Sequence, residues 1–411
     1  MEAVVITGMA VLAASGTETA QFWDNLQAGR SALSPLTRVR SDKLTTGVAG
    51  EIRDFDPESH FGKEGELLDR FAQFGVICAR RALEHAGLGQ RSPDWPYAAE
   101  RVGVLTGTGM GGICTQDHGF RTIYGEGATR VHPFLIPRSM YSAATSQIGM
   151  ATGARGPSFT ISTACASSTH ALGEAWRLLR SGAADMFITG GSDAPLTFGV
   201  IKAWEAMRVL ASAGTEPSRA CRPFSGDRSG LVLAEGAAMF VLETASGAQR
   251  RGARVLAELA GYGASADAGH ITQPDQAGAG FAMREALRSA GLAPEEVDYI
   301  NAHGTGTKLN DATEIAAIKE VFGPAAQRLS ISSTKSMHGH AMGASGAIEL
   351  AATLLALEHQ VVPPTANYTI PDPECDLDVT PNQARPRPLR AALSNSFAFG
   401  GLNAVLAVRR S

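Results

Sequence analysis

The chain carries little charge, few cysteines and no excess of basic residues. Charged residues make up 18% of its 411 residues, and the formal net charge is -4. Because it lacks an overall basic field, nucleic acid is not expected as its main partner. Hydrophobic residues, at 44%, are frequent enough for a globular protein, and the polar segments are too short for extended disorder. We therefore expect the whole chain to fold.

The five cysteines, at positions 78, 114, 165, 221 and 375, form no CxxC pair. Their odd number and scattered positions argue against a disulfide framework and are typical of a reducing cytosol. No apolar run approaches the roughly 20 residues that a membrane-spanning helix needs. The apolar N-terminus has Glu2 where a signal peptide carries positive charge, so it predicts a buried strand instead. We expect a cytoplasmic protein.

The length predicts two domains, or one duplicated α/β unit with roughly 150 to 250 residues in each half. Continuous apolar strands followed by glycine turns and helices occur at 4–8, 101–109, 159–163 and 185–193. Such strands predict a buried, largely parallel sheet. A second series covers 253–265, 297–307 and 329–336 and ends in a hairpin-like pair at 389–408. We expect two similar α/β halves, residues 1–250 and 251–411, packed tightly together.

Cys165 is the candidate nucleophile. Residues 156–182 predict a strand, a short turn and a helix whose first turn contains Cys165. Unpaired N–H groups and the helix dipole at that position lower the pKa of a thiol from about 8.5 and favour the thiolate. The neighbouring alanines and serines leave room for a bulky thioester. Most buried cysteines are inert, and the other four lack this environment. We expect Cys165 to be nucleophilic.

Histidines follow two predicted strands in the second half. His303 ends one strand and precedes two glycines and two threonines, whereas His338 and His340 enter a helix rich in glycine and alanine. Strand ends that share one edge of an α/β sheet build sites, so Cys165, His303 and His340 are expected to converge. Each histidine alone is more often an ordinary structural residue, and three similar positions together favour a site. His338 is expected to be a bystander of the turn.

Metal binding is the rival use of one cysteine and two histidines. The spacing lacks HExxH or CxxC character and the nearby carboxylates are isolated, so we expect no metal. Gly107, Gly109 and Gly112 satisfy GxGxxG after a strand, which is typical of a dinucleotide site. No strand with an acidic end follows at the required distance. We interpret these glycines as close packing beside the site, with Met110 as a pocket wall.

The segment NSFAFGGLN at 395–403 combines two phenylalanines with paired glycines. It could supply an oxyanion N–H and a movable aromatic gate, or two core phenylalanines before a final strand. The pattern alone favours neither.

These motifs together resemble the elongating, thiolase-fold β-ketoacyl-acyl-carrier-protein synthases of bacterial fatty-acid and type II polyketide systems. The resemblance covers essentially the whole chain and rests on TACASS at 163–168, NAHGTGT at 301–307, STKSMHGH at 333–340 and NSFAFGG at 395–401. It implies a thiolase-like fold with a layered αβαβα core. Leu402, where many members have threonine, and WEAMRVL at 204–210 look most like nodulation protein E and the ketosynthases of polyene pathways.

The resemblance implies a two-step reaction. Cys165 takes an acyl group from the phosphopantetheine arm of an acyl carrier protein. A malonyl carrier then loses carbon dioxide with the help of His303 and His340, and its carbanion attacks the thioester. The backbone N–H groups of Cys165 and Phe399 would form the oxyanion hole, with Phe399 also acting as the gate. No cofactor is implied beyond the arm of the carrier.

The same resemblance assigns supporting roles. Lys335 and Glu314 would orient the histidines, Thr305 and Thr307 would hydrogen-bond the pantetheine arm, and Arg208 would lie at the carrier-docking entrance. The segment 62–70 is less basic than in many relatives, which leaves the choice of carrier open. A dimer is expected, either of two copies or with a chain-length factor. Acyl length, saturation and pathway are not predicted, apart from the hypothesis of a polyene product.

Other functions remain as alternatives. A chain-length factor or a scaffold without activity has the same fold, but a chain-length factor usually lacks the cysteine. A thiolase needs a second cysteine in a glycine motif near the C-terminus, and a starter-unit synthase has asparagine in place of one histidine. An NAD-dependent oxidoreductase would rest on the GxGxxG pattern alone.

Overall fold

The computed structural model describes residues 2–39, 42–92 and 94–411. Ten strands form one sheet, in the order β10-β9-β13-β14-β8-β1-β7-β6-β4-β5. Their bounds are β1 (Val4–Ala13), β4 (Val102–Gly107), β5 (Ser158–Ile161), β6 (Met186–Asp193), β7 (Gly236–Thr244), β8 (Ala257–Ala266), β9 (Tyr299–Asn301), β10 (Ser330–Ser332), β13 (Ala391–Ala398) and β14 (Leu402–Arg410). Two short pairs lie outside it, β2 (Ser34–Pro35) with β3 (Val48–Ala49), and β11 (Val361–Val362) with β12 (Arg385–Pro386).

The sheet is a duplication. In chain order, the five strands of the first half and the five of the second occupy the same relative positions, β5-β4-β6-β7-β1 and β10-β9-β13-β14-β8. The first strands of the two halves, β1 and β8, join them through a short antiparallel pairing of Val5 with Glu258 and Ile6 with Ala257. The prediction of two similar α/β halves is confirmed. Because one sheet runs through both, a domain boundary at 250/251 stays a prediction.

The expectation of a largely parallel sheet is wrong. Parallel pairing is confined to β4 with β5 and β6, and to β9 with β10 and β13. The other pairings are antiparallel, including the predicted terminal hairpin of β13 and β14. Strands covered on both faces are continuously apolar whatever their direction. The strand pattern therefore predicted burial correctly and direction wrongly.

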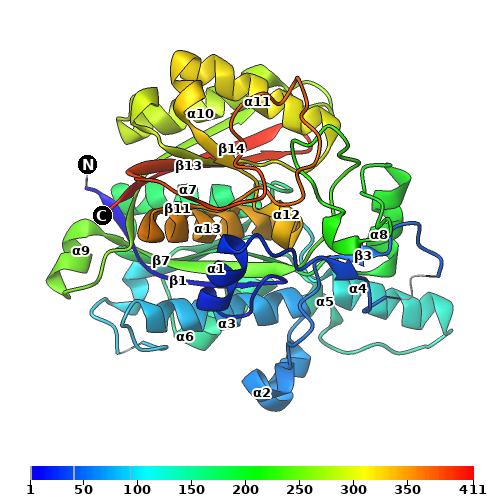
Figure 1. Cartoon of the computed structure of the whole chain (residues 1–411). Helices are drawn as coiled ribbons and strands as arrows, with labels where there is room; N and C mark the ends of the chain where they lie inside the picture. Colours follow the sequence, from blue (N-terminus) through cyan, green and yellow to red (C-terminus); the bar gives the residue numbers. More distant parts are fainter. Residues whose placement is uncertain (1, 40–41, 93) are drawn as a thin grey trace.

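Helices and the two halves of the sheet form five layers (Figure 1). The helices α3 (Arg70–His85) and α6 (Ala143–Thr152) cover the outer face of the first half, and α10 (Gln276–Ala290) and α11 (Lys308–Phe322) cover that of the second. Between the halves lie α7 (Ser167–Arg180) and α13 (Ser345–His359). Every residue of α13 from Ser345 to Leu357 is buried, as expected for a helix that is apolar all round. The layered αβαβα prediction is confirmed.

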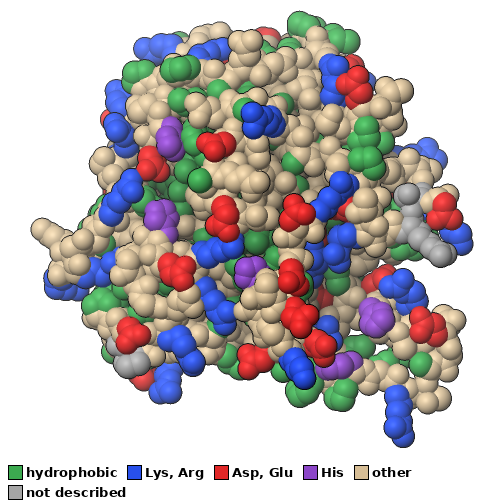
Figure 2. All heavy atoms as spheres, turned by 60° about the horizontal axis from the view of Figure 1, so that its bottom comes forward, with side chains coloured by type: hydrophobic (Ala, Val, Ile, Leu, Met, Phe, Trp, Pro, Cys, Tyr) green, Lys and Arg blue, Asp and Glu red, His purple; other side chains and the backbone are tan. Residues whose placement is uncertain are grey.

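The remaining helices lie at the ends of the strands and on the surface. They are α1 (Thr19–Gln27), α2 (Pro57–Phe61), α4 (Ile113–Phe120), α5 (Leu135–Ser139), α8 (Phe198–Ala206), α9 (Ala245–Arg250) and α12 (Lys335–His338). Figure 2 shows basic and acidic side chains intermingled on one face, consistent with the small net charge. Across the described ranges, no helix is both long enough and apolar enough to cross a bilayer.

Candidate active site

Cys165 lies in the turn between β5 and α7. The helix begins at Ser167, so the expectation that its first turn contains Cys165 is wrong by two residues. The turn is tight because Ala164 adopts a left-handed φ of +50° and the Ser167 hydroxyl donates to the Ala164 carbonyl at 2.6 Å. A Cβ on Gly107 would lie 2.3 Å from the Ser167 backbone. That glycine serves close packing, as predicted, and lets β4 support the nucleophile turn.

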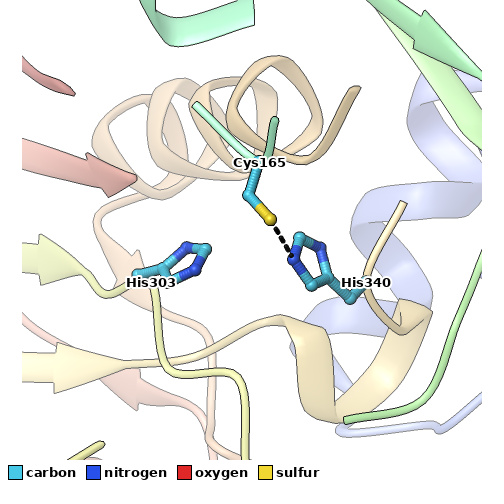
Figure 3. A group of neighbouring side chains, drawn as sticks. All are labelled: Cys165, His303 and His340. Carbon is cyan, nitrogen blue, oxygen red and sulfur yellow. Dashed lines mark hydrogen bonds between the residues drawn. The ribbon is translucent and has the colours of Figure 1, made fainter. Parts of the chain in front are cut away.

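His340 occupies the matching turn of the second half, between β10 and α13. Its Nε2 lies 3.0 Å from the Cys165 Sγ, and its Nδ1 lies 2.7 Å from the Ser345 hydroxyl. The His340 backbone is held by two hydrogen bonds, from its N–H to the Val232 carbonyl and from the Ala234 N–H to its carbonyl. The ring is therefore fixed at both ends and points at the thiol (Figure 3).

His303 completes the group from the loop after β9. The His303 and His340 ring centroids are 5.5 Å apart with an interplanar angle of 84°. Ligating atoms of Cys165, His303 and His340 all lie within 4.8 Å of one another, and all three residues are buried. Figure 3 shows the two imidazoles facing one point beside the thiol. The structure confirms the predicted convergence of these three residues.

Lys335 and Glu314 hold His303, each in the position expected for an orienting residue. The Lys335 ammonium donates to the His303 carbonyl at 2.6 Å and lies 3.5 Å from its Nδ1. The Glu314 carboxylate accepts from the backbone N–H groups of His303 and Gly304, at 2.9 and 2.8 Å. Because the ammonium faces Nδ1, the neutral imidazole carries its proton on Nε2.

Burial decides the protonation states of the site. It lowers the pKa of His303 and of His340 well below 6.5, and the positive charge of Lys335 lowers both further. Burial also raises the pKa of the Cys165 thiol to about 12, against which Lys335 and a hydrogen bond from the Phe399 backbone act in the opposite direction. The expected lowering of the thiol pKa is therefore wrong for this closed site. The loss of hydration raises the thiol pKa by more than the nearby helix terminus lowers it.

The three donor atoms would also suit a metal ion by proximity. Tetrahedral zinc, with its usual bonds of about 2.3 Å to sulfur and 2.0 Å to nitrogen, keeps these two ligand atoms roughly 3.5 Å apart. The 3.0 Å between Cys165 Sγ and His340 Nε2 is shorter and fits a hydrogen bond. The expectation that no metal binds here stays a prediction.

A cavity of about 390 Å³ leads to these residues. Cys165, His303 and His340 contribute to its wall, together with Thr305, Thr307, Arg208, Phe397 and Phe399. The two threonine hydroxyls lie 2.9 Å apart, and Arg208 is exposed. Seven predicted catalytic, binding and carrier-docking residues thus line one cavity.

Phe399 is partly buried and stacks on Trp204, with ring centroids 5.8 Å apart and 23° between the ring planes. It lies in the turn after β13, so the alternative of an ordinary core phenylalanine does not describe it. Phe397, by contrast, is a buried core residue that contacts the His303 ring edge. The two phenylalanines of this segment have different surroundings.

Met110 and Phe134 do not line the cavity. Met110 packs in an apolar cluster with Met342, Trp204 and Phe399, so its role as a pocket wall stays a prediction. Phe134 is 52% exposed. His338 bonds the Thr334 hydroxyl and the Gly339 carbonyl and does not line the cavity, which fits a bystander.

Asp193, at the end of β6, is the main residue that the sequence analysis missed. Its buried carboxylate accepts from the Thr108 hydroxyl and from the backbone N–H groups of Gly109, Met110 and Gly343, at 2.7 to 3.0 Å. A Cβ on Gly343 would lie 2.3 Å from the Gly109 nitrogen. One carboxylate therefore joins the loop beside Cys165 to the turn after His340. An acidic residue ending an apolar strand was the available signal.

Glu349 was also missed. It is fully buried within α13 and forms an ion pair with Lys335, and burial raises its pKa to about 7. A single carboxylate inside an otherwise apolar helix was the sequence signal. Buried carboxylates of this kind need a partner, and here the partner is the lysine that holds His303.

Known proteins are similar to this chain in sequence. Residues 1–248 match the family Beta-ketoacyl synthase, N-terminal domain, and residues 256–369 match Beta-ketoacyl synthase, C-terminal domain. Nodulation protein E of Rhizobium sp. (strain N33) is 47% identical over 407 residues, which cover 99% of both chains. The 3-oxoacyl-[acyl-carrier-protein] synthase 2 of Staphylococcus aureus (strain COL) is 41% identical over 410 residues, 99% of this chain and 98% of its own.

Solved ketosynthase structures are similar to this chain in fold. A type II polyketide ketosynthase, bound to a hexaketide and in complex with its acyl carrier protein, superposes with a TM-score of 0.91 at 35% identity, covering 100% of this chain and 99% of its own. The ishigamide ketosynthase/chain length factor gives a TM-score of 0.90 at 34% identity with the same coverage. With the thiol and two imidazoles at one point of a thiolase-like fold, the chain belongs to the β-ketoacyl synthase family.

Proposed function

We propose that this chain is an acyltransferase that condenses a malonyl unit, carried on an acyl carrier protein, with an acyl group bound to Cys165. The observation that carries the proposal is the thiol 3.0 Å from the His340 imidazole, with His303 facing the same point of a 390 Å³ cavity. Relatives named as 3-oxoacyl-[acyl-carrier-protein] synthases support it at 41% identity across nearly the whole chain.

Acyl transfer to Cys165 is the first step. The thiol is neutral at rest because its pKa is about 12, so it must lose its proton as it attacks. The nearest acceptor is His340 Nε2, which is neutral and can pass that proton to the departing thiol of the carrier. The carbonyl oxygen would accept from the backbone N–H groups of Cys165 and Phe399, each such donor contributing about 3 kcal/mol to barrier lowering.

Decarboxylation is the second step. The bond between the malonyl methylene and its carboxylate breaks, carbon dioxide leaves, and the electron pair enters the thioester as an enolate. Neutral His303 carries its proton on Nε2 and can donate a hydrogen bond to the enolate oxygen, and His340 can do the same in the tautomer whose Nδ1 accepts from the Ser345 hydroxyl. The carbanion then attacks the Cys165 thioester, which releases the sulfur and lengthens the chain by two carbons. The released Cys165 thiolate takes up a proton that solvent supplies through His340, and the thiol is ready for another acyl group.

The carrier would dock at the cavity mouth, where Arg208 is exposed. A cation at this position suits an acidic carrier surface. Thr305 and Thr307, which line the same cavity, would hydrogen-bond the amide groups of the pantetheine arm. A ketosynthase of the same fold has been solved with its carrier, which supports this partner.

A dimer is part of the proposal. The strand β5 ends the sheet, and Phe159 within it is 44% exposed. Nearby helical segments expose further apolar side chains, including Ile136 at 65% and Met150 at 61%. An exposed apolar edge favours pairing with another sheet. The partner would be a second copy or a chain-length factor, and the pathway a nodulation-type or polyene one, in the cytoplasm.

The test is intact-mass spectrometry of the protein and its carrier after incubation with a short acyl carrier and a malonyl carrier. The proposal predicts an acyl adduct on the protein and a β-ketoacyl carrier longer by two carbons, both lost in Cys165→Ala. If neither appears, even with a chain-length-factor subunit added, the chain is a scaffold or a chain-length partner and the proposal is wrong.

A further inference from the structure

A buried arginine contributes to the wall of the cavity. Arg228 is 2% exposed, and its guanidinium bonds groups from separate segments of the chain. Nε donates to the Thr307 carbonyl at 3.2 Å, Nη2 to the Lys308 carbonyl at 3.0 Å, and Nη1 to the Ser225 carbonyl at 3.0 Å and to the Asp372 carboxylate. Two of these acceptors are consecutive carbonyls at the end of the loop that carries the cavity threonines.

The same loop is also held at Gly306. Gly306, between the two threonines, has a left-handed φ of +81° and donates its N–H to Asp311 at 3.2 Å. Its carbonyl accepts from the Gly230 N–H at 3.1 Å, and a Cβ on Gly306 would lie 2.9 Å from the Gly230 carbonyl oxygen. The loop therefore rests directly on the segment that carries Arg228.

The charge of Arg228 is secured within the protein. Burial alone would lower its pKa, but the carboxylates of Asp372 and Asp311 outweigh burial and raise that pKa, so the guanidinium stays protonated. Asp311 Oδ2 lies 3.5 Å from Arg228 Nε and is itself fully buried. A planar guanidinium can reach several acceptors in fixed directions, which a lysine ammonium on a flexible stem does not reproduce.

We infer that Arg228 is the positioning residue of the pantetheine-binding loop, keeping the Thr305 and Thr307 hydroxyls turned toward the cavity. It acts through the loop, because the hydrogen bonds of its guanidinium go to three carbonyls and one carboxylate of the protein. The inference rests on the proposed function, in which these two threonines bind the arm of the carrier. It predicts that Arg228 governs how well carrier-borne substrates bind, and not the chemistry at Cys165.

The test compares two acyl donors on Arg228→Lys. With the acyl carrier, KM should rise about tenfold while kcat stays within about twofold, because binding hydrogen bonds are misplaced. With a p-nitrophenyl ester of the same acyl group, which lacks the pantetheine amides, the rate of Cys165 acylation should change by less than about twofold. Arg222→Lys is the matched control, since Arg222 lies in the same segment and pairs with Asp227 at the partly exposed surface.

Coupling to the loop is measured by a double-mutant cycle with Thr305→Val. If Arg228 acts through Thr305, the double variant should raise KM for the acyl carrier little beyond the larger single effect. Should Arg228→Lys fail to fold, Asp372→Asn replaces it, because Asp372 holds the guanidinium from a more exposed position, and about a threefold rise in KM is then expected.

Three results would overturn the inference: an unchanged KM for the acyl carrier, an equal loss with both acyl donors, or fully additive effects in the cycle. An unmodified protein that forms no product with any carrier would instead overturn the proposed function, and the inference with it. That outcome appears before any variant is made, so the two failures are distinguishable.

Discussion

The two halves of this chain have the same strand order and different chemistry at equivalent places. The turn after β5 carries Cys165, whereas the equivalent turn after β10 carries His340. The loop after β4 is rich in glycine, whereas the loop after β9 carries His303 and the cavity threonines. Because the two halves have the same strand order, these equivalent loops meet at one site. The first half then contributes the thiol and close packing, and the second contributes the imidazoles and the charges that hold them.

The largest loss of activity should follow from removing the Cys165 thiol, which the first half supplies. Cys165→Ala should reduce condensation below detection, because it removes the thiol that carries the acyl chain. Product formation by mass spectrometry measures it, with thermal unfolding to show that the fold is kept. Cys114→Ala is the control: Cys114 lies in the same half, outside the cavity, and should retain activity. Equal loss in both variants would contradict the assignment.

The next largest effect should follow from breaking the buried ion pair between Lys335 and Glu349 in the second half. Lys335→Ala leaves Glu349 buried without its ion-pair partner, so the free energy of unfolding should fall by about 3 kcal/mol. Condensation should fall roughly 100-fold, because His303 loses its orienting donor. Chemical denaturation and initial rates measure both. Lys202→Ala, whose side chain is 38% exposed, should cost under about 1 kcal/mol, and a similar cost at both positions would contradict the account.

Asp193→Ala tests the connection between the halves. It leaves three backbone N–H groups without an acceptor, so unfolding should become easier by about 2 kcal/mol and condensation about tenfold slower. Asp185→Ala, one residue before the same strand, removes a surface pair with Arg101 and should cost under about 1 kcal/mol. Matching losses in the two variants would mean that Asp193 has no special connecting role.

The smallest expected change concerns pH. Because the pKa values of His303 and His340 lie well below 6.5, both imidazoles stay neutral as pH falls through about 6.5 and protonate only at much lower pH. Carbon dioxide release should therefore be nearly constant from about pH 6 to 8, on the premise that neutral imidazoles serve the reaction. A rate that halves near pH 6.5 would show that the imidazoles have ordinary pKa values.

Much of this comparison could be predicted from the sequence. The strand and turn pattern gave the two halves, and the histidines at strand ends gave the convergence with Cys165. Strand direction could not be predicted, because β7 and β14 are as apolar as the parallel strands. The thiol pKa was wrong because the sequence showed the nearby helix and not the depth of burial. Asp193 and Arg228 were missed because their partners lie far away in the chain.

The most direct test of the account is carbon dioxide release from the malonyl carrier by the acylated protein, in His303→Ala, His340→Ala and His338→Gln. If both cavity imidazoles act on the enolate, each alanine variant should lose at least about 100-fold. His338→Gln, at a buried histidine outside the cavity, should stay within about tenfold. The claim that both cavity imidazoles act on the enolate would be contradicted by near-normal carbon dioxide release in either alanine variant. It would also be contradicted by an equal loss in His338→Gln.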